Sequence, residues 1–125
     1  MKAIIFDSPR CVISGIIFYL IIAGPALAYS GNAVIGKSLY VADCSGCHLA
    51  SGAGGVHFNQ AVSADLRSPG LETTYKHNDD LLLRAILEAK DETGKRLDSP
   101  MPAWRSRLSQ PQALDIIAYL KTLHS

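Results

Sequence analysis

Residues 42–50 read ADCSGCHLA, and Cys44, Cys47 and His48 place two thiols and an imidazole within five positions of one another. Three chemistries use such a string of residues: a redox disulfide, part of a zinc site, and the covalent attachment of a haem. The choice among them depends on the compartment, on the elements around the string and on the other ligand-type residues of the chain.

The N-terminal region has the three parts of a secretory signal peptide. A basic start precedes an uncharged apolar run over residues 11–23, and a small-x-small tripeptide ends at Ala28. This pattern predicts cleavage after Ala28, so that residues 1–28 are a signal peptide and residues 29–125 are the mature domain. A retained membrane anchor is the alternative, since the apolar stretch only just reaches the roughly 18 residues that a membrane span requires.

Export decides which cysteines remain and in which compartment they work. Cys11 leaves with the signal, so Cys44 and Cys47 are left in an oxidising compartment outside the cytoplasm. Removing the signal also leaves equal numbers of basic and acidic residues, so no charge excess favours nucleic acid or anionic lipid as a partner. A domain of this size is marginal on apolar burial alone, and a bound group in its core would help to stabilise it.

Periodic apolar residues predict an all-α domain with three main helices. The first follows Asn32 as its N-cap, has Ile35, Leu39 and Tyr40 at helical spacing, and leads directly into the cysteines. The second covers residues 79–90, where two leading acids suit the positive end of the helix dipole. Its apolar stripe is formed by Leu82, Leu83, Ile86 and Leu87.

The third helix begins at Ser109, where Ser-Gln-Pro-Gln predicts a capping box with Gln112. Its apolar stripe comprises Ala113, Ile116, Ile117, Leu120 and Leu123. No run alternates well enough to predict a sheet. The connecting segments 49–76 and 91–108 are long for so small a domain, and loops of this length are expected where they wrap a large ligand that completes the core.

The surroundings of the cysteines separate the three chemistries. A thioredoxin-like CxxC follows a strand, whereas the segment before Cys44 is helical in pattern and no strands follow. A structural zinc site needs four ligands, and the motif supplies three, which leaves as the fourth His57, His77 or His124, none of them at a typical spacing. C-x-x-C-H as a unit is the attachment signature of c-type haem. The sequence therefore predicts one covalently bound haem c.

The spacing of the motif follows from the chemistry of attachment. The two thiols add to two vinyl groups on one side of the porphyrin, and residues i and i+3 of a helical turn share a face, so Cys44 and Cys47 reach neighbouring vinyls together. His48 then places its Nε2 on the iron as the proximal ligand. The small residues Ser45 and Gly46 are expected to let the backbone approach the haem edge.

Met101 is the candidate for the distal iron ligand. It is the methionine that remains once the signal is removed, and Pro100 and Pro102 on either side restrict the backbone and remove donors. A rigid loop suits a weak thioether ligand, whereas an adaptable core filler is the ordinary role of a lone methionine. The fallback ligands are His57, His77 and His124.

Trp104 and the second helix supply further candidates for contact with the cofactor. The indole N–H of Trp104 is expected either to touch a haem propionate or, as a buried aromatic, to anchor the methionine loop. The stripe of the second helix is the candidate for the walls of the haem pocket: Leu82, Leu83, Ile86 and Leu87.

The mature chain resembles the class I cytochromes c, which are small monohaem electron carriers with His/Met ligation. GKSLYVADCSGCH is similar to the N-terminal helix of that family, MPAW to its methionine loop, and ALDIIAYLKTL to its C-terminal helix. The resemblance implies a small cytochrome c fold, in which Tyr119 packs across the N-terminal helix near Gly36. One departure is that no proline follows His48 before Pro69, which leaves open the acceptor that orients this imidazole.

With both axial positions filled, electron transfer is favoured over chemistry on bound oxygen or peroxide. We therefore expect a periplasmic one-electron carrier, not an enzyme, whose partners are redox proteins and which meets a membrane through them or through a retained N-terminal segment. The alternatives are a haem-bearing subunit of a dehydrogenase or oxidase, a five-coordinate haem sensor or peroxidase, and a thiol oxidoreductase that uses Cys44 and Cys47.

Charged residues near the methionine leave the mode of partner docking open. The cations are Lys95, Arg96, Arg105 and Arg107. The acids Asp91, Glu92 and Asp98 share the neighbourhood, so either a cationic docking ring or a solvated face of mixed charge is compatible with the sequence.

Overall fold

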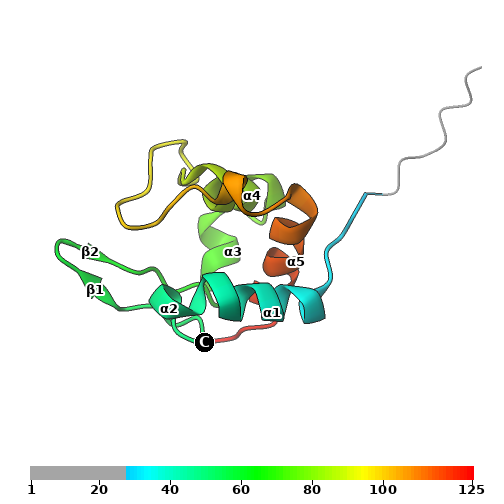
Figure 1. The fold of residues 1–125 in the computed structure, drawn as a ribbon, viewed down its shortest axis with the longest axis horizontal. Coiled ribbons are helices and arrows are strands. Elements are labelled where there is room, and N and C mark those ends of the chain that lie inside the picture. Colours follow the sequence, from blue (N-terminus) through cyan, green and yellow to red (C-terminus); the bar gives the residue numbers. More distant parts are fainter. Residues whose placement is uncertain (1–27) are drawn as a thin grey trace, which may run out of the picture.

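The computed structural model describes residues 28–125, and Figure 1 shows the fold. The predicted signal peptide, apart from Ala28, lies outside the described residues, and its cleavage stays a prediction. The described elements are α1 (Ala33–Asp43), α2 (Ser45–His48), β1 (His57–Phe58), β2 (Ala61–Val62), α3 (Gly70–Thr74), α4 (Asp79–Glu88), the 3-10 helix η1 (Trp104–Ser106) and α5 (Gln110–Leu120). The all-α class is confirmed, with α1, α4 and α5 as the main helices.

Side chains cap each main helix, and for α1 and α5 they do so at the predicted residue. Asn32 accepts hydrogen bonds from the backbone N–H groups at the start of α1, and Asn78 does the same for α4. Ser109 and Gln112 form the complete capping box of α5. These bonds satisfy backbone donors that have no partner inside the helix. At the other end, α4 stops at Glu88 because Ala89 takes a left-handed conformation with φ 53°, two residues before the predicted end.

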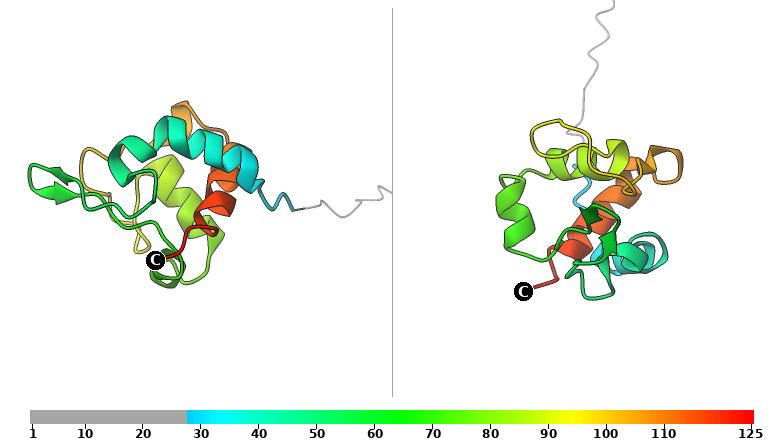
Figure 2. Two further views of the ribbon diagram at one scale, coloured as in Figure 1. Left: turned by 90° about the horizontal axis from the view of Figure 1, so that it is seen from below. Right: turned by 90° about the vertical axis from the view of Figure 1, so that its left-hand side faces the viewer.

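α5 packs against both α1 and α4, as Figure 2 shows from two sides. The crossing of α1 and α5 depends on Gly36, since a Cβ at this position would lie 1.8 Å from the backbone oxygen of Asp115. One turn further along α1, the rings of Tyr40 and Tyr119 meet at 5.4 Å between centroids. The crossing implied by the family resemblance is therefore present in the structure.

A buried carboxylate of α5 holds the residues that precede α1 against α5. Asp115 of α5 is 4% exposed and accepts hydrogen bonds from the hydroxyl of Tyr29 and the backbone N–H of Asn32. The hydrogen bond from Tyr29, with burial and the charge of Asp115 as smaller causes, raises the pKa of the tyrosine. These hydrogen bonds hold Tyr29 and Asn32 against α5.

The stripe expected on the first helix is partly wrong. Tyr40 is fully buried, but Ile35 is 48% exposed and Val34 and Val41 point to solvent with it. Because Gly36 faces α5, the buried side of α1 runs through Gly36 and Tyr40, one residue away from the position of Ile35.

Within residues 28–125, none of the helices combines the length and apolar character needed to cross a bilayer.

The long connections contain short elements that the sequence pattern did not predict. β1 and β2 pair antiparallel, with His57 opposite Val62 and Phe58 opposite Ala61. The expectation of no sheet is therefore wrong for this hairpin, whose strands are too short to show alternation and whose turn has Asn59 at φ 54°. The hairpin projects beside α2 at the left of Figure 1.

Candidate functional site

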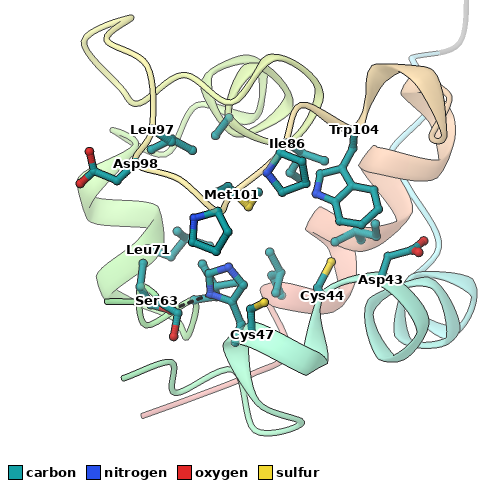
Figure 3. Close-up of a pocket in the computed structure, with 18 of the residues that line it drawn as sticks. Asp43, Cys44, Cys47, Ser63, Leu71, Ile86, Leu97, Asp98, Met101 and Trp104 are labelled. Atoms are coloured by element: carbon teal, nitrogen blue, oxygen red, sulfur yellow. Dashed lines mark hydrogen bonds between the residues drawn. The ribbon is translucent and has the colours of Figure 1, made fainter. Parts of the chain in front are cut away.

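An apolar cavity of about 260 Å³ lies between α1, α2, α4, α5 and the segment around Met101. Cys44, Cys47, His48, Met101 and Trp104 all line it. Figure 3 shows the sulfur atoms of Cys44, Cys47 and Met101 directed into the same space. The structure therefore brings together the two predicted attachment cysteines, the two predicted iron ligands and Trp104.

The first turn after α1 positions the two cysteines. The backbone N–H of Cys44 bonds to Tyr40 and continues the α1 pattern, while those of Cys47 and His48 both bond to the Cys44 carbonyl at 3.2 and 3.0 Å. This turn presents the thiols on one face, as the i, i+3 spacing predicts. A Cβ at Gly46 would meet no protein atom within 4 Å, so protein packing does not explain the glycine.

The environment of Cys44 disfavours thiol chemistry. Burial, followed by the charges of Asp43 and Cys47, raises the pKa of the Cys44 thiol to about 12. A thiol oxidoreductase uses a thiolate at neutral pH, which needs a lowered pKa. Cys44 therefore has the opposite of the electrostatic setting that such an enzyme requires.

The carbonyl of Ala64 orients the imidazole of His48. His48 Nδ1 lies 2.9 Å from Ala64 O, and because a carbonyl only accepts, Nδ1 is the donor, which in the neutral imidazole leaves the lone pair on Nε2. Gly54 makes room for this contact, since a Cβ there would lie 2.2 Å from Ala64 O. Ala64 O is therefore the acceptor that the sequence left open.

Met101 reaches the cavity from a separate part of the chain. Its backbone N–H donates to Asp98 O at 3.1 Å, and Pro100 and Pro102 flank the half-buried side chain. By contrast His57, His77 and His124 are exposed and do not line the cavity, so the fallback ligands lie elsewhere. Within residues 28–125, no group of three or more His, Cys, Asp and Glu side chains is arranged to hold a metal ion.

Only part of the predicted α4 stripe forms a wall. Leu82 and Ile86 line the cavity, whereas Leu83 and Leu87 are buried in the core away from it. The stripe is divided because successive residues of a helix turn by about 100°. The pattern missed several further wall residues, which are Ala85 of α4 and, from other parts of the chain, Phe58, Leu71, Tyr75, Leu97, Ile116 and Leu120. Ile116 and Leu120 belong to the apolar stripe predicted for the third helix, but that pattern did not show that they face a cavity.

Two of the expected docking cations are paired with acids. Arg105 forms an ion pair with Glu88 of α4, and Arg107 lies 3.3 Å from Asp43 of α1. Lys95 and Arg96 are exposed in the loop that follows α4. The pairing of the arginines favours a face of mixed charge over a cationic ring.

The residues present fit a covalently bound haem. Two thiols on one helical turn match the two vinyl groups, and the cavity offers an imidazole and a thioether as axial ligands. Its walls are mainly apolar side chains, which suit a porphyrin face. The donor set contains no second cysteine pair, as a structural zinc site commonly does.

The sequence model of the family described as Cytochrome c matches residues 33–124. The chain belongs to the cytochrome c family. Its members bind haem c covalently and transfer electrons, and both statements extend to this cytochrome c. The fold and the cofactor expected from the sequence are therefore confirmed.

Two solved cytochromes resemble this cytochrome c in fold. Cytochrome cL from Hyphomicrobium denitrificans gives a TM-score of 0.56 at 20% identity and matches 78% of this chain, which spans only 51% of that protein. Cytochrome c6 from the diatom Phaeodactylum tricornutum gives 0.50 at 21% identity, over 72% of this chain and 91% of that one. No curated protein sequence matches the chain. At these identities the similarity concerns the fold alone.

Proposed function

We propose that this cytochrome c is a periplasmic one-electron carrier, with haem c joined to Cys44 and Cys47 and its iron held between His48 and Met101. The observation that carries the proposal is that Met101, far away in the sequence, lines the same cavity as the C-x-x-C-H motif. The signal-like N-terminus supports export.

The chain's residues set the properties of the site. When bound, the haem supplies an iron centre that changes charge by one electron. His48 is held in one tautomer by Ala64 O and keeps Nε2 free for the metal. The thioether of Met101 stabilises the ferrous state, and apolar wall residues such as Leu82 and Ile86 exclude water, which also raises the reduction potential.

Occupied axial positions distinguish a carrier from an enzyme. If His48 and Met101 both bind the iron, no substrate can bind there without displacing a ligand. The proposal therefore excludes a peroxidase or a gas sensor that binds its ligand at an open sixth position. It assigns contact with redox partner proteins to the mouth of the cavity, where Cys47 and Val62 are exposed.

A carbon monoxide test checks this ligand set. We expect the ferrous haem-loaded protein to leave its visible spectrum unchanged under carbon monoxide, because Met101 fills the site. The Met101→Ala variant serves as the positive control and is expected to bind the gas. Rapid binding by the wild-type protein would contradict the proposal and favour the five-coordinate alternative.

A fixed subunit of a dehydrogenase or oxidase is the second candidate. Val34, Ile35 and Val41 are exposed apolar side chains on α1, and exposed apolar surface is common at protein interfaces. Co-purification of the native protein with a larger membrane or periplasmic complex would support this candidate, whereas isolation as a free monomer supports the carrier.

A further inference from the structure

A charged contact joins the segment that follows Met101 to α1. Arg107 Nη2 lies 3.3 Å from Asp43 Oδ1, and the guanidinium carbon lies 5.4 Å from the centroid of the Trp104 ring. Asp43 and Trp104 both line the cavity, and Figure 3 shows them next to each other on the side where Cys44 lies. Arg107 therefore bridges two walls of the site.

The two walls that Arg107 joins belong to the segments that carry the two proposed iron ligands, His48 and Met101. Asp43 directly precedes Cys44 at the start of the motif that contains His48, whereas Arg107 follows Met101 by six residues. The η1 turn makes the intervening segment compact, because the backbone N–H groups of Arg107 and Leu108 both bond to Trp104 O at 2.8 Å. A contact made at Arg107 is therefore transmitted to the position of Met101.

The contacts of Arg107 are strong enough to change how often the weak Met101 thioether leaves the iron. The side chain of Asp43 is 12% exposed and that of Arg107 is 68% exposed, so solvent screens only one end of the pair. An ion pair of this kind and a cation–π contact each change an equilibrium by a factor of roughly two to five. An iron–thioether bond that is in equilibrium with a dissociated form is sensitive to changes of this size.

We propose that Arg107 is a positioning residue that keeps Met101 on the iron by holding the methionine segment against α1. The proposal rests on the proposed function, in which Met101 is the distal ligand. Removing the contact increases the fraction of molecules in which Met101 has left the iron, by about fivefold. Met101 then competes less well with an added ligand.

Imidazole binding to the ferric haem-loaded protein measures this fraction. The loss of the methionine-to-iron charge-transfer band during a titration gives the apparent affinity for imidazole. We expect about fivefold tighter binding in Arg107→Ala and a smaller increase in Asp43→Asn, which keeps the contact between Arg107 and Trp104. The double variant is expected to match Arg107→Ala, because that substitution already removes the ion pair with Asp43.

Arg105→Ala is the matched control. Arg105 belongs to the same η1 turn, its side chain is 66% exposed, and it pairs with Glu88 of α4 instead of Asp43. Its loss removes the same charge without releasing the segment from α1, so we expect an imidazole affinity within about twofold of the wild-type value.

The variants separate positioning from a plain charge effect. If the uncompensated carboxylate of Asp43 were the cause, Arg107→Ala and Asp43→Asn would shift the affinity in opposite directions, and the proposal would be wrong. Unchanged affinity in Arg107→Ala, or an equal change in Arg105→Ala, would also overturn it. If the wild-type protein shows no charge-transfer band, the assignment of Met101 itself fails, and this result is distinct from the others.

Discussion

At the scale of single residues, the contact between His48 and Ala64 shows that a loop backbone orients the imidazole although no proline follows His48 before Pro69. The acceptor is a backbone carbonyl, which every residue has, so no side chain in the sequence identified it. What permits the approach is Gly54, with φ 62° and with Ala64 O in the place of a side chain. The orientation of His48, the proposed proximal ligand, thus depends on a glycine ten residues before its acceptor.

Gly54→Ala is expected to displace the Ala64 carbonyl and to weaken the hydrogen bond of His48. The imidazole then becomes a weaker donor to the iron, so the midpoint potential rises, and the stability falls by about 2–4 kcal/mol. Redox titration and urea unfolding measure the two effects.

Gly55→Ala is the control for this change. Gly55 has φ 80° but nothing within 4 Å of its added Cβ, so the variant has the backbone strain alone, at about 1 kcal/mol. Equal midpoint potentials in the two variants would contradict the role given to Gly54.

Ionisation of the buried Tyr40 is expected to lower the free energy of unfolding in alkaline solution. Burial, followed by the charges of Cys44 and Tyr119, raises its pKa from 10.0 to about 12, so the folded state favours the neutral phenol. The resulting stabilisation is complete below pH 10 and is lost as the pH rises through 12. Tyr40→Phe lacks this contribution, and it also loses the hydrogen bond to Leu49 O at 2.7 Å, worth about 1 kcal/mol at neutral pH.

The difference in unfolding free energy between wild type and Tyr40→Phe, followed from pH 9 to pH 12, checks this account. It is expected to shrink over the upper part of that range. A difference that stays constant to pH 12 would show that the phenol of Tyr40 titrates normally.

At the scale of elements, the predictions succeeded where the chemistry is local. Asn32 and Ser109 cap helices through neighbours a few residues away, and the sequence alone reveals such pairs. The outward position of Ile35 depends instead on which side of α1 meets α5, and the β1–β2 hairpin has strands of two residues each. Both depend on tertiary packing that local patterns do not encode.

Gly36→Ala tests the close crossing of α1 and α5. An added Cβ would collide with the Asp115 backbone, so the helices must separate and the stability is expected to fall by about 2–4 kcal/mol. Gly70→Ala is the matched control in α3, since its Cβ meets nothing within 4 Å, and we expect a change of less than about 1 kcal/mol. Urea unfolding of the haem-loaded variants gives both values; similar losses would argue against the crossing.

At the scale of the whole molecule, the site is an assembly of distant segments. The sequence singled out Cys44, Cys47, His48 and Met101, which line one cavity, because haem attachment and thioether ligation need particular side chains. It did not identify most of the cavity walls, since Leu71, Leu97 and Ile116 are ordinary core residues until the fold places them around one space. The ligand-type residues were therefore easier to predict than the residues that form the cavity wall.

The charge distribution predicts electron exchange that responds weakly to salt. Removing the signal leaves balanced charges, and Arg105 and Arg107 are paired with acids. We expect the rate of oxidation by a small anionic complex to change less than about threefold between about 0.01 and 0.2 M salt. A steep decrease with salt would instead indicate a cationic docking ring.

The ferric visible spectrum of the haem-loaded protein, compared with that of Met101→Ala, tests the central claim most directly. If His48 and Met101 hold the iron from opposite sides, the wild-type protein shows a methionine-to-iron charge-transfer band and the variant lacks it. A wild-type spectrum without this band, or a band that persists in the variant, would contradict the account.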